Sequence, residues 1–223
     1  MTLVKPQKVF FDWDGTLVDS FLFLHAAHNY ARQQLGIEPF AVEEFEGYFG
    51  QPREILYVKI YGDQSEEAKT HFEHYVRNNH LDGLHPIDGA LEVLQTLEKL
   101  NIPCGVVTNK KRTLVEEEIK AFGWSDYFDV LIGAADAAND KPSPDPLLMA
   151  MDRSTQVLDT EQVWFVGDTD NDTACSNAVG TKTILILDPV KEQKKTEEIL
   201  GNYHIDLHVS DCKKFHEFLL QYA

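Results

Sequence analysis

Residues 9–17 decide the fold, and they read Val9-Phe10-Phe11-Asp12-Trp13-Asp14-Gly15-Thr16-Leu17. A short apolar run ends in two carboxylates two positions apart, and the glycine that follows breaks the strand. Side chains at i and i+2 of a strand share a face, so we expect Asp12 and Asp14 to sit together where the backbone turns. Two like charges that close repel unless a cation or a shared proton compensates. The pair is a candidate for chemistry, and the alternative is an Asx-type turn that closes a strand.

The composition is that of a globular protein, with 43% hydrophobic and 26% charged residues among 223. The three cysteines are too few and too widely spaced for a disulfide framework, which indicates a reducing compartment. No leader-like segment precedes the first strand, and no apolar stretch approaches the ~18 residues of a membrane span. We therefore expect a soluble cytoplasmic protein without membrane contact.

The formal net charge of −17 bears on the choice of partner. It disfavours nucleic acid, because affinity for a polyanion comes from lysine and arginine side chains that neutralise phosphates. An acidic surface also repels small anions. An anion site in this chain would therefore need a metal ion or a few well-placed lysines, and the alternative is that the charge only keeps the protein soluble.

The pattern of apolar residues divides the chain into two parts. From residue 20 to residue 85 the spacing is helical throughout, which predicts a separate, inserted helical domain. Residues 1–19 and 86–223 alternate strand-like and helix-like segments, which predicts a Rossmann-like α/β core: a parallel sheet with helices on both faces. The strands are expected at residues 9–11, 102–108, 130–133, 163–167 and 183–187, with a weak one at 206–209.

Polar side chains follow four different predicted strands. Asp12, Thr108 and Asp168 come directly after strands, and Lys141 lies in the loop after residues 130–133. Ligands of open α/β sheets bind at the carboxyl ends of the strands, where these loops converge. Carboxylates suit Mg²⁺, while a lysine and a hydroxyl suit phosphate. Each residue alone has an ordinary explanation, as a helix start, a solvated charge or a turn residue, but coincidence explains all four together poorly.

These stretches resemble the four motifs of the haloacid dehalogenase superfamily of phosphatases, and the resemblance covers essentially the whole chain. The segment from Phe11 to Ser20 is similar to the first motif, Thr108-Asn109 to the second, Lys141-Pro142 to the third, and Gly167-Asp168 with Asp172 to the fourth. Four motifs in this order and spacing are specific, although each alone is modest evidence.

The resemblance implies a role for each matching residue. Asp12 would be the nucleophile and a Mg²⁺ ligand, and Asp14 would protonate the leaving group, activate water and give the metal its backbone carbonyl. Thr108, Asn109 and Lys141 would hold the phosphoryl group. Asp168 would ligate Mg²⁺, and Asp172 would orient the groups around the metal. Residues 20–85 would form the helical cap, in which Arg53 is a candidate to grip a substrate carboxylate or, alternatively, is a solvated arginine.

We therefore expect a Mg²⁺-dependent phosphatase that hydrolyses a small phosphorylated metabolite through an aspartyl-phosphate, acting as a monomer or homodimer. Asp14 favours a phosphomonoester, because an O-linked phosphate needs a proton donor, and the motif style is that of phosphoglycolate phosphatases. The alternatives within the superfamily are a phosphosugar mutase, a nucleotidase and a pyrophosphatase. Alternatives from other classes are a receiver-type signalling protein and a non-catalytic phosphate-binding protein.

Overall fold

The computed structural model describes residues 3–48 and 53–223, with the backbone alone for residues 53–55. The chain divides into two compact units, Met1–Val18 with Pro86–Ala223, and Asp19–His85. It passes between them through two short strands that pair with each other, β2 (Val18–Asp19) and β3 (His85–Pro86). Within the described ranges, no helix has both the length and the apolar character needed to cross a membrane.

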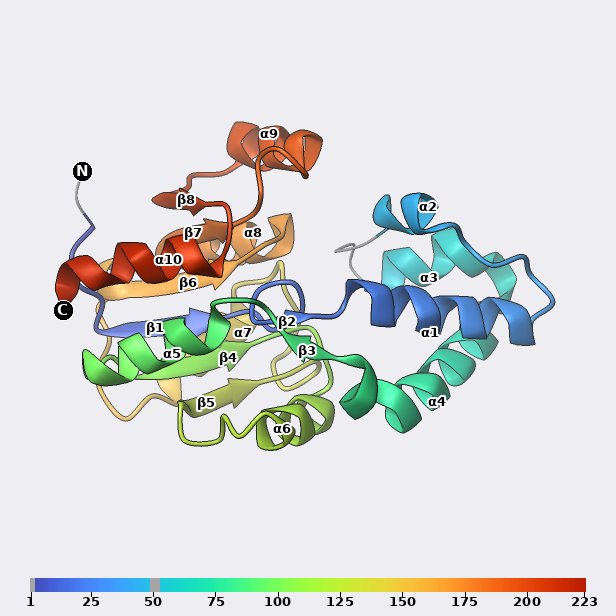
Figure 1. Cartoon of the computed structure of the whole chain (residues 1–223), viewed down its shortest axis with the longest axis horizontal. Coiled ribbons are helices and arrows are strands. Elements are labelled where there is room, and N and C mark those ends of the chain that lie inside the picture. Colours follow the sequence, from blue (N-terminus) through green and yellow to red (C-terminus); the bar gives the residue numbers. More distant parts are fainter. Residues whose placement is uncertain (1–2, 49–52) are drawn as a thin grey trace. The chain divides into compact units, whose positions relative to one another are not determined.

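The larger unit is built on a six-stranded sheet in the order β5-β4-β1-β6-β7-β8 (Figure 1). All neighbouring strands pair in parallel, so the predicted parallel α/β core is confirmed. The strand that ends in the acidic pair lies in the interior of the sheet, between β4 and β6. The strands are β1 (Lys8–Phe11), β4 (Cys104–Val107), β5 (Phe128–Ile132), β6 (Val163–Gly167), β7 (Lys182–Ile186) and β8 (Leu207–Val209).

Helices cover both faces of this sheet, and α5 and α10 lie side by side over one of them (Figure 1). The α-helices are α5 (Ala90–Lys99), α6 (Arg112–Ala121), α7 (Asp145–Asp152), α8 (Asp170–Val179), α9 (Gln193–Asn202) and α10 (Cys212–Leu219). Two 3₁₀ turns, η2 (Thr160–Gln162) and η3 (Leu220–Tyr222), complete the unit.

Strand β1 is buried on both faces, which explains why the apolar residues Val9, Phe10 and Phe11 follow one another in it without alternating with polar ones. Successive side chains point to opposite faces. Phe10 packs with Phe165 and Leu147 in one apolar cluster, whereas the ring of Phe11 meets Phe215 of α10 edge-on at 6.4 Å. The packing on the two faces of the sheet holds β1 in place and so fixes the position of Asp12, which follows it.

The smaller unit is helical among its described residues outside the two short connecting strands. It contains α1 (Phe21–Gln34), α2 (Val42–Glu46), α3 (Arg53–Tyr61), η1 (Gly62–Gln64) and α4 (Ser65–Gly83). Its core includes Ala31, Tyr57, Tyr61 and Ala68. The buried ring of His28 lies among them, with its Nδ1 2.9 Å from the Tyr61 hydroxyl.

Element ends differ from the sequence prediction in a few places. The spacing of apolar residues predicts helices over residues 42–49 and 65–79. Helix α4 instead continues four residues further, to Gly83, and α2 stops at Glu46. The strands β2 and β3 were not predicted, because a strand of two residues is too short to show a periodic pattern of apolar residues. The sequence also predicts a loop at residues 50–52, which lies outside the described residues, as does the side chain of Arg53.

Candidate active site

The predicted site residues converge at the carboxyl ends of adjacent strands. Asp12 follows β1, Thr108 follows β4 and Asp168 follows β6, and these are neighbours in the sheet. The backbone hydrogen bonding between β1 and β6 continues into the site, since the Asp12 amide donates to the Val166 carbonyl at 2.9 Å. All three side chains are buried, and so is Lys141 from the loop after β5. The sheet order therefore brings together residues that are far apart in the sequence.

Lys141 joins the first and fourth motifs. Its ammonium donates a 2.7 Å hydrogen bond to Oδ1 of Asp12 and a 2.6 Å hydrogen bond to Oδ1 of Asp172. Burial alone would lower the pKa of Lys141, but the two carboxylates outweigh burial and raise its pKa above the usual value. The ammonium therefore stays charged between the two buried carboxyl groups.

Asp172 is held by the start of α8. Its Oδ2 accepts hydrogen bonds from the Thr169 amide at 3.0 Å and from the Thr169 hydroxyl at 2.6 Å. The Asp172 amide in turn donates to the Thr169 hydroxyl oxygen at 3.4 Å, and the two bonds that involve backbone amides form a capping box. Thr169 is the N-cap residue and satisfies donors that every helix leaves open at this end. The other carboxylate oxygen is then free to face Lys141.

Two glycines let the backbone come close to these carboxylates. A Cβ at Gly15, where φ is +85°, would lie 2.6 Å from Oδ2 of Asp168, and a Cβ at Gly167 would lie 2.3 Å from Cβ of Asp172. No side chain fits at either place without movement. Thr16 then donates a 2.9 Å hydrogen bond to Oδ1 of Asp168.

The donor set suits a hard divalent cation. Asp12, Asp168 and Asp172 each offer an oxygen, and these three atoms lie within 4.8 Å of one another. Burial, followed by the neighbouring Asp172, raises the pKa of Asp12 to about 8. Burial is also the main cause that raises the pKa of Asp168 to about 6, against the lowering effect of Lys195. A cation beside these carboxylates would favour their charged forms, which is the arrangement that Mg²⁺ or a similar ion requires.

Asp14 and Asn109 make different contacts from those that the motifs alone indicate. The carboxylate of Asp14 faces Lys110, whose ammonium lies 3.0 Å from its Oδ1, rather than Lys141. The Asn109 side chain binds the main chain of Lys141 through two hydrogen bonds, next to a cis peptide bond between Lys141 and Pro142. Lys110 directly follows the Thr108-Asn109 motif, but its contact with Asp14 was not predicted from the sequence.

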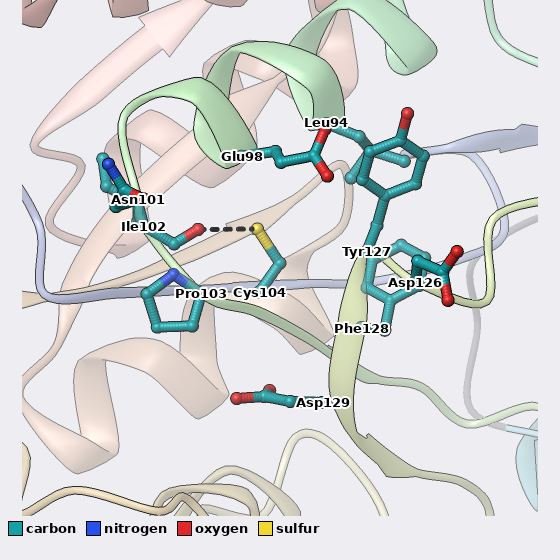
Figure 2. A pocket seen from close by; sticks show the side chains of 10 residues that line it. All are labelled: Leu94, Glu98, Asn101, Ile102, Pro103, Cys104, Asp126, Tyr127, Phe128 and Asp129. Atoms are coloured by element: carbon teal, nitrogen blue, oxygen red, sulfur yellow. Dashed lines mark hydrogen bonds between the residues drawn. The ribbon is translucent and has the colours of Figure 1, made fainter.

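A pocket lies at the opposite ends of the strands (Figure 2). Cys104 and Phe128, which begin β4 and β5, are among its lining residues, whereas the carboxylate cluster follows strand ends. Three of its lining side chains are acidic, which is unsuited to a phosphate group. The pocket is lined by Leu94, Glu98, Asn101, Ile102, Pro103, Cys104, Asp126, Tyr127, Phe128 and Asp129.

The fold and the site together define a Rossmann-like α/β protein whose sheet edge suits a divalent cation and a phosphate group. Comparison with known proteins then specifies the class: a model of the haloacid dehalogenase-like hydrolase family matches residues 9–186. The chain belongs to this family, and the resemblance seen in its motifs is confirmed.

Two relatives and one solved structure show how far the likeness extends. A phosphoglycolate phosphatase of Neisseria meningitidis is 32% identical over 187 residues, covering 80% of this chain and 79% of the relative. The pyrophosphatase PpaX of Bacillus thuringiensis is 28% identical over 210 residues, covering 91% and 93%. A haloacid dehalogenase-like family hydrolase from Streptococcus pneumoniae superposes with a TM-score of 0.82 at 24% identity, covering 95% of this chain and 97% of that structure. At 24% identity, the likeness to the Streptococcus pneumoniae structure shows that the two proteins share a fold.

Proposed function

We propose that this protein is a Mg²⁺-dependent phosphatase that hydrolyses a small phosphomonoester through an aspartyl-phosphate on Asp12. The observation that carries the proposal is the buried cluster in which Lys141 bonds to Asp12 and Asp172, with Asp168 within reach of the same ion. Asp14, two residues from the proposed nucleophile, provides a second acid. A receiver-type or non-catalytic protein would not need one.

In the first step the Asp12 carboxylate attacks phosphorus, and the bond from phosphorus to the leaving oxygen breaks. Asp14 gives its proton to that oxygen, so the alcohol leaves neutral. Thr108 and Lys141 hold the phosphoryl oxygens and offset their charge. In the second step a water attacks the phosphoryl group, Asp14 takes its proton, and Asp12 is released with free phosphate.

Asp12 and Asp168 would hold the Mg²⁺ ion, together with the backbone carbonyl of Asp14. When bound, the ion neutralises charge on the phosphoryl group and on the surrounding carboxylates. Asp172 keeps Lys141 in place beside the nucleophile. Burial of charged carboxylates costs free energy, and in this proposal the Lys141 ammonium and the Mg²⁺ ion offset that cost.

For the substrate we propose a phosphoglycolate-like monoester, in line with the Neisseria meningitidis relative. The second candidate is pyrophosphate, because the Bacillus thuringiensis relative is a pyrophosphatase. Arg53 stays a predicted ligand of a substrate carboxylate, so Arg53→Ala should raise the KM for carboxylated substrates and leave that for pyrophosphate unchanged.

The test is a screen of phosphate release over phosphoglycolate, sugar phosphates, nucleotides, pyrophosphate and an aryl phosphate, with Mg²⁺ and with a chelator. We expect release from a monoester that chelation abolishes. Asp12→Asn should abolish release while circular dichroism stays unchanged, and Asp126→Asn, an exposed residue of the distant pocket, should behave as wild type. Isomerised sugar phosphate as the product would favour a mutase, and activity that survives in Asp12→Asn would remove the nucleophile.

A further inference from the structure

A chain of buried polar contacts leads from the carboxylate of Asp14 into the core of the larger unit. The Lys110 ammonium lies 3.0 Å from Oδ1 of Asp14 and 2.9 Å from Oε2 of Glu118. The same Oε2 accepts a 2.6 Å hydrogen bond from the indole nitrogen of Trp13. Three segments contribute: the loop after β1, the loop after β4, and helix α6.

The inner end of this chain is fixed by packing. The Trp13 ring stacks on Phe122 at 6.3 Å and meets Trp124 and Phe128 edge-on at 5.9 Å and 6.1 Å. Neither Trp13 nor Glu118 has any exposed surface. A buried carboxylate is costly unless it is paired and hydrogen-bonded, and here two donors converge on one oxygen of Glu118. The anchor is therefore rigid, and it fixes the lysine in turn.

The outer end of the chain reaches the site. The side chain of Lys110 is 8% exposed, whereas that of Asp14 is 20% exposed and so is within reach of a substrate. The described contact between the two is made through Oδ1 of Asp14, which leaves Oδ2 as the oxygen that can exchange a proton. Proton transfer depends on placing this oxygen within hydrogen-bond reach of the leaving group.

We propose that Lys110 and Glu118 are positioning residues for the proton transfers of Asp14, with Trp13 as their anchor. The proposal rests on the proposed phosphatase function. Lys110 fixes the orientation of the Asp14 carboxylate, and Glu118 prevents the lysine from turning toward the phosphoryl group or the other carboxylates. Trp13 thus has a task in the first motif beyond filling the position between two aspartates.

The inference predicts a dependence on the leaving group. An alkoxide is a poor leaving group and needs the proton from Asp14, whereas a nitrophenolate leaves well without it. Misplacing Asp14 should therefore slow the first step for alkyl phosphates far more than for p-nitrophenyl phosphate. A variant that only loosens the fold would slow both substrates equally.

The experiment compares kcat/KM for the best alkyl phosphate of the screen with that for p-nitrophenyl phosphate. Lys110→Met and Glu118→Gln are the test variants, Asp14→Asn sets the full effect, and Lys120→Met on the exposed face of α6 is the control. We expect Lys110→Met to lose about 10- to 100-fold on the alkyl substrate, less than the whole contribution of a general acid, and about threefold or less on the aryl one. Lys110→Arg should restore part of the loss.

Equal losses on both substrates, or no loss, would overturn the inference while leaving the phosphatase proposal intact. If wild-type protein and Lys120→Met release no phosphate from any substrate, the phosphatase proposal fails, and this inference fails with it. Should Glu118→Gln fold poorly, Trp13→Phe keeps a ring in the same place and removes only the N–H donor. Trp13→Phe should show the same leaving-group dependence in weaker form. If it shows none, the polar contacts between Trp13, Glu118 and Lys110 do not position Asp14.

Discussion

The side chain of Asn109 and the main chain of Lys141 exchange two hydrogen bonds. The Asn109 amide donates to the Lys141 carbonyl at 2.8 Å, and the Lys141 amide donates to Oδ1 of Asn109 at 2.9 Å. The second motif thereby fixes the backbone of the third. This relationship makes Asn109 a support for Lys141 through its side chain, in addition to any contact of its backbone with phosphate.

Replacing Asn109 by aspartate should displace Lys141. Aspartate can still accept from the Lys141 amide but no longer donates to the Lys141 carbonyl, and it sets an anion against that oxygen. An unsatisfied buried group costs roughly 1–3 kcal/mol, so we expect a lower free energy of unfolding and a kcat/KM for phosphate release lowered by about 10-fold or more. Asn202→Asp is the control, because Asn202 also donates to a backbone carbonyl but on an exposed helix end. Equal effects of the two variants would show that Asn109 does not support the lysine.

Much of the fold could be predicted from the sequence because the strands β1, β4 and β6 are buried on both faces. Apolar runs such as β1 and β6 stand out against helical spacing, and the weak strand predicted at residues 206–209 is present as Leu207–Val209. The order of the strands could not be predicted, because the two pairings of β1, with β4 and with β6, join segments more than 90 residues apart. Residues that follow β1 and β4 meet only because these strands are neighbours.

The site was predictable as far as the motifs extend. Asp12, Asp168 and Lys141 come together as expected from their places after strands, and Asp172 at the start of α8 meets them through Lys141. The contact between Lys110 and Asp14 was not predictable, because it depends on the direction of a side chain beyond β4 and on a glutamate one helix further on. Thr169 was equally missed, although a threonine three residues before an acid is the signal of a capping box.

Removal of the Lys141 ammonium should destabilise the metal-free protein strongly. Lys141→Met leaves Asp12 and Asp172 buried without their shared cation, and breaking a buried pair in this way costs roughly 3–5 kcal/mol. We expect a urea unfolding midpoint far below that of wild type in the presence of a chelator. Lys120→Met, which removes an exposed lysine, should change the free energy of unfolding by about 0.5 kcal/mol or less. Equal midpoints for both variants would contradict the role of Lys141 as counter-charge.

Helix α10 should lose part of its stability in acid. Its N-cap residue Asp211 accepts hydrogen bonds from the Ser210 hydroxyl at 2.7 Å and from the Lys214 amide at 2.8 Å. These contacts, the serine first, lower the pKa of Asp211 below its value of about 3.9 in an unfolded chain. The stabilisation is therefore complete above the unfolded pKa and is lost as the pH falls through the folded pKa.

Urea unfolding of wild type and Asp211→Asn measures this effect, because asparagine keeps a capping oxygen but does not titrate. The difference in the free energy of unfolding between the two proteins should change between pH of about 6 and about 3, with wild type losing more. A difference that stays constant over this range would show that the Asp211 charge contributes nothing to the cap.

Gly15 should be required for metal binding rather than for the turn alone, and Gly180 offers a matched control. The two residues have nearly equal positive φ values, +85° and +83°, so alanine should cost about 1–2 kcal/mol of backbone strain at each. They differ in their surroundings: a Cβ at Gly15 would lie 2.6 Å from Oδ2 of Asp168, whereas a Cβ at Gly180 would meet nothing within 4 Å. In Gly15→Ala the Asp168 carboxylate must shift from its place beside the other acidic side chains. We expect the Mg²⁺ concentration for half-maximal phosphate release to rise by about 10-fold or more, with no rise in Gly180→Ala. If both variants lose stability equally and keep the wild-type Mg²⁺ requirement, Asp168 does not hold the ion.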